Sequence, residues 1–281
     1  MLRSFRQEFW GNTIMAPDTH LQADEQVLLR NDAEGICTLT LNRPDKRNPL
    51  STQMLSALQN TLDDIADDKM VKVVIIAAKG PVFCAGHDLK EMRANTNYNF
   101  IHELFLQCSR MMLTMTQLPQ PIIAKVHGVA TAAGCQLVAS CDLAIAAESA
   151  RFGTPGVTNG LFCSTPAVAV SRAVSSKHAM EMLLLGELFS PEDALRFGLI
   201  NRIVPVQKLD STVLEYAESI ASRSTLTMSM GKGAFYRQLD MELEDAYTYT
   251  SDVMARNMME RDAQEGIDAF LQKRHPKWTG R

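Results

Sequence analysis

The sequence lacks the features of a membrane-spanning or disulfide-stabilised secreted protein. No run approaches the roughly 20 apolar residues that span a bilayer, since even the apolar stretch 71–78 contains Lys72 and has only the length of a strand. The six cysteines show no C-x-x-C spacing and lie mostly among apolar neighbours. We therefore expect buried, reduced thiols and no membrane insertion.

Several common ligand-binding signatures are also absent. The chain has no G-x-G-x-x-G, no P-loop and no H-E-x-x-H pattern, so a dinucleotide, a nucleoside triphosphate and a catalytic zinc are not indicated. The formal net charge of −4 argues against a general nucleic-acid binder, because such proteins concentrate Lys and Arg. We expect no metal and no nucleic-acid partner, and an anionic ligand must meet a local basic cluster.

The composition that is present fits a globular α/β chain. Its 281 residues are 46% hydrophobic and 21% charged, which suits one large domain or two smaller ones. Short β-branched runs at 26–30, 35–41, 71–78, 122–126 and 142–146 alternate with helical patterns, such as the one after Ser51. A turn over 31–34 joins the first two runs. The pattern is helical from residue 165, apart from one last short strand over 198–204.

Three regions are expected on this basis: an N-terminal arm or leader over 1–25, a core over 26–204 and a helical region over 205–281. Residues 1–14 carry Arg3 and Arg6 but lack the apolar centre of a secretory signal. A disordered arm, a short organellar leader and an upstream start before Met15 remain alternatives. The location would be cytoplasmic in a bacterium and the mitochondrial matrix in a eukaryote.

Two small-residue turns are the most informative feature. A strand, a tight turn and a helix follow one another in this order twice. The turns have the sequences Phe-Cys-Ala-Gly-His-Asp-Leu at 83–89 and His-Gly-Val-Ala-Thr-Ala-Ala-Gly-Cys-Gln-Leu at 127–137. Backbone N–H groups at the start of a helix are unpaired and carry partial positive charge. Small residues let a ligand approach them closely. The pattern therefore predicts two turns that bind an oxygen atom.

Four motifs in this order resemble the crotonase, or enoyl-CoA hydratase/isomerase, superfamily. They are Asn-Arg-Pro-Asp-Lys-Arg-Asn-Pro-Leu at 42–50, Ala-Gly-His-Asp-Leu at 85–89, the segment 128–137, and Ala-Phe-Leu-Gln-Lys-Arg-His-Pro at 269–276. The resemblance runs from about residue 26 to the end. It implies a spiral of ββα units followed by a helical trimerisation region, and assembly as a homotrimer or a dimer of trimers.

The resemblance also assigns the ligand and its contacts. It implies an acyl-CoA thioester as substrate or ligand, with no separate cofactor. The backbone N–H groups of His87 and Ala133 would form an oxyanion hole that stabilises a thioester enolate. Residues of this chain that match CoA-binding positions are Lys46, Arg47, Ala85 and Lys90, together with Phe270 and Lys273, which in the family reach the CoA of an adjoining subunit.

The carboxylates that hydration requires are missing at the matching positions. Adding water to an enoyl thioester needs groups that accept and return protons, which suits paired carboxylates. The first hydratase Glu corresponds to Gln136, whose amide cannot carry a proton in this way. The second corresponds to Gly156, and an acid of some isomerases corresponds to Ser164. Ordinary hydratase activity is therefore doubtful.

Three interpretations of function follow. The first is an enzyme of the enoyl-CoA hydratase/isomerase type, a lyase or isomerase in fatty acid metabolism, that keeps enolate stabilisation without the standard glutamates. The second is a non-catalytic acyl-CoA-binding oligomer. The third is a hydratase with a substitute acid or base, for which His87, His102 and Cys135 are the candidates.

Overall fold

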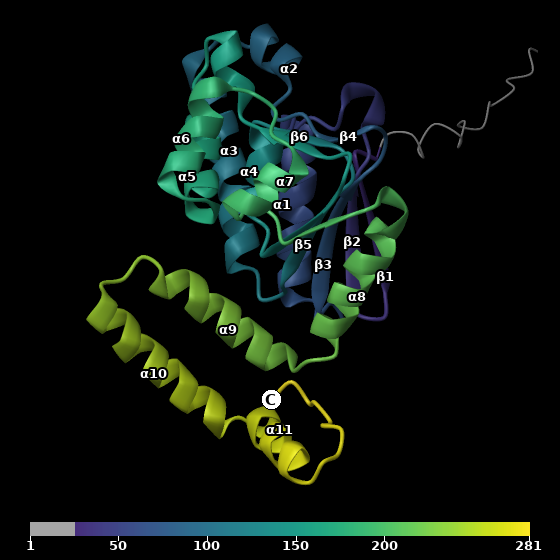
Figure 1. The fold of residues 1–281 in the computed structure, drawn as a ribbon, viewed down its shortest axis with the longest axis vertical. Helices are drawn as coiled ribbons and strands as arrows, with labels where there is room; N and C mark the ends of the chain where they lie inside the picture. The colour runs from purple at the N-terminus through teal and green to yellow at the C-terminus, as the bar shows by residue number, and fades with distance from the viewer. Residues whose placement is uncertain (1–25) are drawn as a thin grey trace, which may run out of the picture.

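The computed structural model describes residues 26–281, so the predicted arm or leader over 1–25 lies outside the described residues. Two sheets and their covering helices form the body of the molecule (Figure 1). The strands are β1 Leu28–Ala33, β2 Ile36–Leu41, β3 Val73–Ala78, β4 Val82–Cys84, β5 Ile122–Val126, β6 Val129–Thr131, β7 Leu143–Ala147, β8 Arg151–Gly153 and β9 Arg202–Val204. A six-stranded sheet has the order β1-β2-β3-β5-β7-β9, and a three-stranded sheet has the order β4-β6-β8.

The helices alternate with these strands and then continue alone. They are α1 Thr52–Asp67, α2 Leu89–Ala94, α3 Tyr98–Gln117, α4 Ala133–Ala139, α5 Ser164–Ala173, α6 Ser176–Leu185, α7 Pro191–Phe197, α8 Leu209–Ala221, α9 Thr225–Gln238, α10 Leu243–Met259 and α11 Arg261–Leu271. Short 3-10 turns lie at Pro44–Lys46, Pro155–Asn159 and Val206–Lys208. No helix of the described residues is both long and apolar enough to cross a bilayer.

The chain repeats a ββα unit. In each repeat one strand enters the six-stranded sheet, the next enters the three-stranded sheet, and a helix follows: β3, β4 and α2, then β5, β6 and α4, then β7, β8 and α5. The expected α/β spiral of ββα units is confirmed. The strands β4 and β6 of the small sheet were not predicted, because they have three residues each and show no period that sequence reading can detect.

The first hairpin differs from its predicted form. β1 pairs antiparallel with β2 through Ala33 and Ile36, and the turn is Glu34-Gly35, with φ of 50° and 81°. Two left-handed residues are typical of a two-residue hairpin turn. The predicted turn over 31–34 was placed too early, since Asn31, Asp32 and Ala33 extend an exposed edge strand that hydrophobicity does not mark.

The six-stranded sheet has a separate hydrophobic core on each face. On one face α1 buries residues at helical spacing, including Met54, Leu58 and Leu62, and Ser51 caps its N-terminus through Met54 N–H. On the other face α8 packs Val213 and its apolar neighbours onto the sheet. The sheet is therefore covered by helices on both sides, as parallel sheets require.

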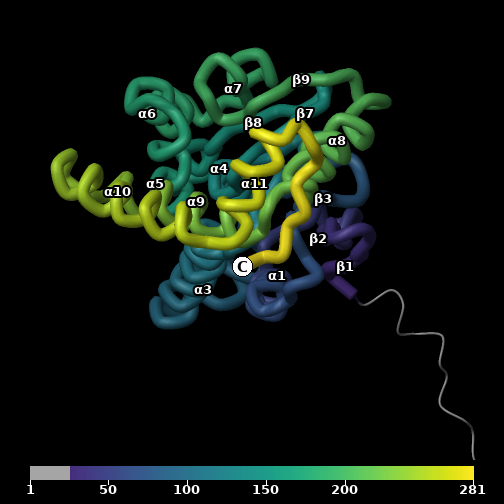
Figure 2. Tube along the Cα trace, turned by 90° about the horizontal axis from the view of Figure 1, so that it is seen from below, coloured from purple at the N-terminus to yellow at the C-terminus, as the bar shows by residue number. Residues whose placement is uncertain are grey.

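The helices α9, α10 and α11 leave this body. Both views show α10 projecting beyond the sheets (Figures 1 and 2). Large apolar side chains on these helices and their connection are exposed, namely Phe235, Leu239, Leu243, Tyr247, Met254, Met258, Met259, Ile267, Phe270 and Leu271. An apolar surface of this extent is typical of a face that another chain covers.

A buried ionic cluster ties α9 to the spiral. Lys232 Nζ donates hydrogen bonds to Asp142 Oδ2 at 2.7 Å and to the carbonyl oxygens of Met115 and Gln120 at 2.9 and 3.0 Å. The Tyr236 hydroxyl donates to the other Asp142 oxygen at 2.9 Å. Burial lowers the pKa of Lys232, and Asp142 partly offsets this shift. The cluster therefore fixes α9 relative to the sheet.

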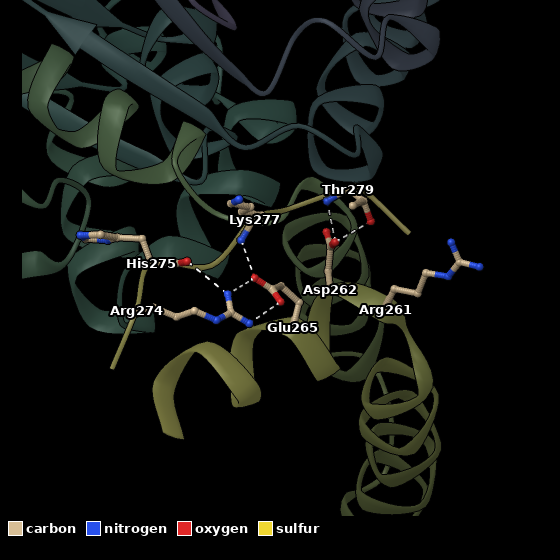
Figure 3. A pocket seen from close by; sticks show the side chains of 7 residues that line it. All are labelled: Arg261, Asp262, Glu265, Arg274, His275, Lys277 and Thr279. Atoms are coloured by element: carbon tan, nitrogen blue, oxygen red, sulfur yellow. Dashed lines mark hydrogen bonds and ion pairs between the residues drawn. The ribbon is translucent and has the colours of Figure 1, made fainter. Parts of the chain in front are cut away.

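The C-terminal segment 272–281 folds back over α11 (Figure 3). Asp262 accepts hydrogen bonds from Ser224 Oγ at 2.6 Å, Thr279 N at 2.7 Å and Gly280 N at 2.9 Å. Glu265 binds the Arg274 guanidinium, which lowers the pKa of that carboxyl to about 2. These side chains border a cavity of about 540 Å³. Two carboxylates thus hold the end of the chain in place.

Replacing Lys232 by methionine is expected to lower the free energy of unfolding by about 3–5 kcal/mol, because Asp142 is then left buried without its cation. The matched control is Lys125→Met, since Lys125 pairs with Asp210, whose side chain is 85% exposed. That loss should be about 1 kcal/mol or less. Urea unfolding measures both values, and equal losses would contradict the anchoring role of Lys232.

Replacing Asp262 by asparagine is expected to cost about 1–3 kcal/mol at pH 7. Burial raises the pKa of Asp262, but the hydrogen bonds from Ser224, Thr279 and Gly280 outweigh it and leave the pKa below its ordinary value. The charge therefore stabilises the fold above the unfolded pKa of about 4, and this contribution is lost as the pH falls through the folded pKa. The free energy of unfolding, measured at pH 7 and pH 3, should differ less between wild type and variant at the lower pH. The control Asp240→Asn, at an exposed position, should change the free energy of unfolding by close to zero at both pH values. A difference independent of pH would argue against an ionised Asp262.

Candidate functional site

The first turn is hydrogen-bonded to the segment that precedes α1. Ala85 N–H donates to Arg47 O at 3.1 Å, and Leu50 N–H donates to Gly86 O at 2.8 Å. Asp88 then caps α2 by accepting from Lys90 N at 3.0 Å. His87 lies between these contacts, and its own N–H donates to no other described residue.

The second turn contains a strained residue. Ala132 has φ 50° and ψ −120°, a conformation that favours glycine, and its N–H donates to Gly153 O at 2.9 Å. Such a backbone costs on the order of 1–3 kcal/mol and tends to occur at functional sites. It turns the chain directly into α4, of which Ala133 is the first residue. The Ala133 N–H is one of the unpaired donors at a helix start.

The small sheet brings the two turns together. β4 and β6 are parallel neighbours, with Cys84 opposite Ala130, and β8 lies beside β6. Parallel strands end at the same edge of a sheet, so the turns after β4 and β6 and the segment after β8 meet there. The three segments carry His87, Ala133 and Gly156, which sequence reading had selected from separate motifs.

The two turns touch through their backbones. A methyl group added at Gly86, where φ is +89°, would lie 3.2 Å from Ala133 N and 3.0 Å from Ala132 Cβ. A methyl group added at Gly134 would lie 2.2 Å from Cys84 O. A side chain at Gly134 would overlap the Cys84 carbonyl, and one at Gly86 would be strained by the positive φ and tightly packed against Ala132 and Ala133. The backbones next to His87 and at Ala133 are therefore in direct contact.

Two polar side chains, the half-buried His87 and the buried Gln136, place shielded polar atoms beside these amides. His87 Nδ1 lies 3.2 Å from Leu50 O and donates its proton there, which leaves Nε2 as a buried acceptor without a partner among residues 26–281. Burial lowers the pKa of His87, with smaller opposing contributions from Leu50 and Glu91, so the imidazole is neutral at pH 7. Gln136 is only 4% exposed, and its Oε1 is likewise unpaired within the described chain. Buried polar atoms are usually hydrogen-bonded, so water or a bound ligand is a suitable partner for these two.

Gly156, which the sequence analysis matched to the second hydratase Glu, has no room for a side chain. A Cβ atom at Gly156 would lie 2.4 Å from Leu161 O and 2.7 Å from Cys163 Sγ, because the following loop folds back onto this residue. Ser164, at the third acid position, is exposed at the start of α5. A glutamate at 156 would thus require the loop to move.

No other carboxylate from the middle of the chain replaces the missing pair. Between Gly128 and Pro191 the carboxylates are Asp142, Glu148, Glu181 and Glu187. Asp142 belongs to the buried cluster with Lys232, and the other three are exposed. Among the described residues, no group of three His, Cys, Asp or Glu side chains could hold a metal ion.

Sequence reading missed one acidic residue near the first turn. Glu91 stands three residues after Asp88, the spacing of a local capping box. In the structure it instead binds Thr52, the first residue of α1, through N–H at 3.0 Å and through the hydroxyl. Only the fold reveals this contact, since the two residues are 39 positions apart.

The other proposed proton carriers lie in unfavourable surroundings. Burial raises the pKa of Cys135 to about 12, so this thiol stays protonated near pH 7. His102 is exposed on α3 and stacks on Tyr98 at 5.6 Å. All six cysteines are buried and free, as predicted. Among the named candidates, His87 alone combines burial with a free ring nitrogen beside the turns.

The residues expected to bind CoA fall into two groups. Lys46, Arg47 and Lys90 are exposed close to the first turn, where Ala85 is hydrogen-bonded to Arg47. Phe270, which is 82% exposed, and the following residues lie at the end of α11. This helix is at the opposite end of the molecule from α2 (Figure 1). One chain therefore does not bring the two groups together.

Replacing Gly134 by alanine is expected to destabilise the protein by about 1–3 kcal/mol or more, because the new methyl group would overlap Cys84 O. Gly233→Ala is the matched control, since this helical glycine in α9 has no heavy atom within 4 Å of the added position. It should stabilise the protein by about 0.5–1 kcal/mol through helix propensity. Urea unfolding of both variants should give opposite signs. A neutral Gly134→Ala would show that the turns are not in contact.

Comparison with known proteins agrees with this architecture. The sequence model of the enoyl-CoA hydratase/isomerase family matches residues 31–281. The protein named enoyl-CoA hydratase domain-containing protein 3, mitochondrial, is 47% identical in Xenopus laevis over 261 residues, covering 93% of this chain and 88% of that protein. The human protein of the same name is 49% identical over 246 residues, covering 88% and 81%.

Solved structures show the same fold. The crystal structure of enoyl-CoA hydratase from Mycobacterium smegmatis matches with a TM-score of 0.89 and 49% identity, covering 90% of this chain and 99% of that one. The crystal structure of human enoyl coenzyme A hydratase domain-containing protein 3 matches with a TM-score of 0.88 and 48% identity, covering 90% and 100%. The chain belongs to the crotonase, or enoyl-CoA hydratase/isomerase, superfamily.

Proposed function

We propose that this protein binds an acyl-CoA thioester and stabilises its enolate through the main-chain N–H groups of His87 and Ala133. The contact between the two turns carries this proposal, because Gly86 abuts the Ala133 amide with no side chain between them. Two unpaired donors that converge in a buried place suit an oxygen atom that gains negative charge. Removing one such donor typically costs about 2.7–4 kcal/mol of transition-state stabilisation.

Ordinary hydration is expected to be weak or absent. Gln136 is buried beside the turns and can donate or accept hydrogen bonds, but its amide does not transfer protons near neutral pH. Gly156 cannot be replaced by a glutamate in this loop conformation, because the carbonyl of Leu161 occupies the space. The site thus retains enolate stabilisation and lacks the pair of carboxylates that would move protons.

Two further candidates rest on particular observations. The unpaired Nε2 of the neutral His87 favours a hydratase or isomerase in which this imidazole acts as the base. The full set of missing acids favours a non-catalytic acyl-CoA-binding oligomer instead. Measuring binding and turnover separately distinguishes these candidates, because only the first of them releases a product.

The CoA portion is proposed to meet cations from two chains. Lys46, Arg47, Ala85 and Lys90 lie on the side of the first turn and would contact the CoA of their own subunit. Phe270 and Lys273 are exposed at the far end of α11, which suits contact with the CoA of an adjoining subunit. A homotrimer or a dimer of trimers, formed through the apolar surface of α9–α11, would supply this second contact.

The cellular setting is proposed from the relatives. The names of the Xenopus and human proteins include the word mitochondrial. We propose a mitochondrial location for this chain on that similarity, and a role in fatty acid metabolism on the chemistry of its family.

Purified protein should bind crotonyl-CoA and convert it slowly or not at all, and Gln136→Glu should raise hydration at least about tenfold by restoring one carboxylate beside the turns. A simultaneous Gly156→Glu change, attractive from sequence alone, is unsuitable because of the contact with Leu161. The matched control is Gln120→Glu, a buried amide in the segment between α3 and β5. Calorimetry measures binding, and loss of the enoyl absorbance measures turnover.

Three results would count against the proposal. If no acyl-CoA binds, the proposed class of ligand is wrong. Rapid hydration by the wild type would show that another group moves the protons, and His87→Ala would then identify or exclude the imidazole. Equal rates in the Gln136→Glu and Gln120→Glu variants would place Gln136 outside the reacting region.

A further inference from the structure

We propose that Glu91 is a positioning residue that holds the first oxyanion turn in its binding geometry through Thr52. This inference rests on the proposed function, since it concerns the His87 amide of the same site. Glu91 itself touches no reacting atom in this account. Its carboxylate acts on the backbone that carries the amide.

Glu91 spans two helices. One carboxylate oxygen accepts Thr52 N–H at 3.0 Å, and the other accepts the Thr52 hydroxyl. Thr52 is the first residue of α1, so its N–H is one of the donors that a helix leaves unpaired. A carboxylate is favoured there by the partial positive charge of the helix start. The contact therefore joins α2, which directly follows the first turn, to the long helix α1.

Thr52 is itself well fixed. Gln107 Nε2 of α3 donates to Thr52 O at 3.2 Å and to Ser56 Oγ at 2.8 Å. The next residue back, Ser51, caps α1 and is buried. Glu91 thus binds to a rigid point where α1 and α3 meet. A short helix such as α2, with six residues, has little stability of its own and takes its orientation from such a contact.

The His87 amide lies between two sets of restraints. Before it, Ala85 and Gly86 are hydrogen-bonded to the segment that leads into α1. After it, Asp88 caps α2 and Glu91 fastens α2 to Thr52. His87 Nδ1 also bonds to Leu50 O, and Met92 of α2 packs against the main core. Without Glu91 these contacts would remain, but α2 would lose its hydrogen bonds to α1. We expect α2 then to shift and to turn the His87 N–H away from the oxygen that Ala133 also binds.

A capping box would have used Glu91 differently. With Asp88 as the cap, a glutamate three residues later normally bonds back to the N–H of the capping residue. Here Asp88 Oδ1 accepts hydrogen bonds from Lys90 N–H and Glu91 N–H, while the Glu91 side chain bonds to Thr52. The Glu91 carboxylate therefore bonds to Thr52, 39 residues away, and makes no bond to the N–H of Asp88. A bond between two helices is what a positioning role requires.

The test uses a conjugated dienoyl-CoA, whose absorbance moves to longer wavelength when its thioester carbonyl is polarised. Glu91→Ala should reduce this shift to less than half of the wild-type value and weaken dienoyl-CoA binding about tenfold. Binding of free CoA, which has no thioester carbonyl, should weaken less than binding of the dienoyl-CoA, because Lys90 is the one proposed CoA contact that lies on α2. Glu91→Gln keeps one acceptor oxygen for Thr52 and should recover part of the shift. The control is Glu103→Ala on α3, where the carboxylate pairs with Arg110 at the surface, and it should behave as wild type.

The outcomes separate the two proposals. A wild type that binds the dienoyl-CoA without any shift contradicts the proposed oxyanion hole, whatever Glu91 does. A wild-type shift that persists unchanged in Glu91→Ala overturns the positioning role alone, as does an equal loss of free CoA binding. Should Glu91→Ala not fold, Thr52→Val removes only the hydroxyl contact and must still reduce the shift. An unchanged shift in that variant overturns the inference.

Discussion

The account depends on the contact between two chain segments with no side chain between them. Gly86 lies against the amide of Ala133, and Gly134 lies against the carbonyl of Cys84. Each glycine occupies a place where one carbon atom would force the segments apart. This contact sets the separation of the two free N–H groups, so it determines whether a single oxygen can receive both. The strain at Ala132 is tolerated because the same contact holds it.

The ββα repeat explains how three distant motifs reach one place. Each repeat sends one short strand into the small sheet, and the three strands are parallel neighbours. Whatever follows each strand must therefore gather at the same edge. The first two repeats place an amide there, at His87 and Ala133. The third places Gly156 there, and its loop closes over the space that a glutamate would need. The proposed function follows from this arrangement, with enolate stabilisation retained and hydration weak or absent.

Much of this could be predicted from the sequence, and the remainder had identifiable physical causes. The long strands and α1 have clear periods, and the absence of carboxyl groups at Gln136 and Gly156 is a prediction from the family's motifs. The strands β4 and β6 escaped detection because three-residue strands have no period, and the first hairpin turn was misplaced because an exposed edge strand is polar. Glu91 was not among the residues singled out from the sequence, because its contact with Thr52 depends on the tertiary fold. A contact between residues 39 positions apart follows from the fold, and no local sequence pattern predicts it.

The most direct measurement is a crystal structure of the protein with an unreactive acyl-CoA thioester bound. The account predicts the thioester oxygen at about 2.7–3.1 Å from both the His87 and the Ala133 main-chain nitrogens. It also predicts no Asp or Glu carboxylate within hydrogen-bonding distance of the carbons next to the carbonyl. A thioester oxygen bound elsewhere, or a carboxylate poised over those carbons, would contradict it.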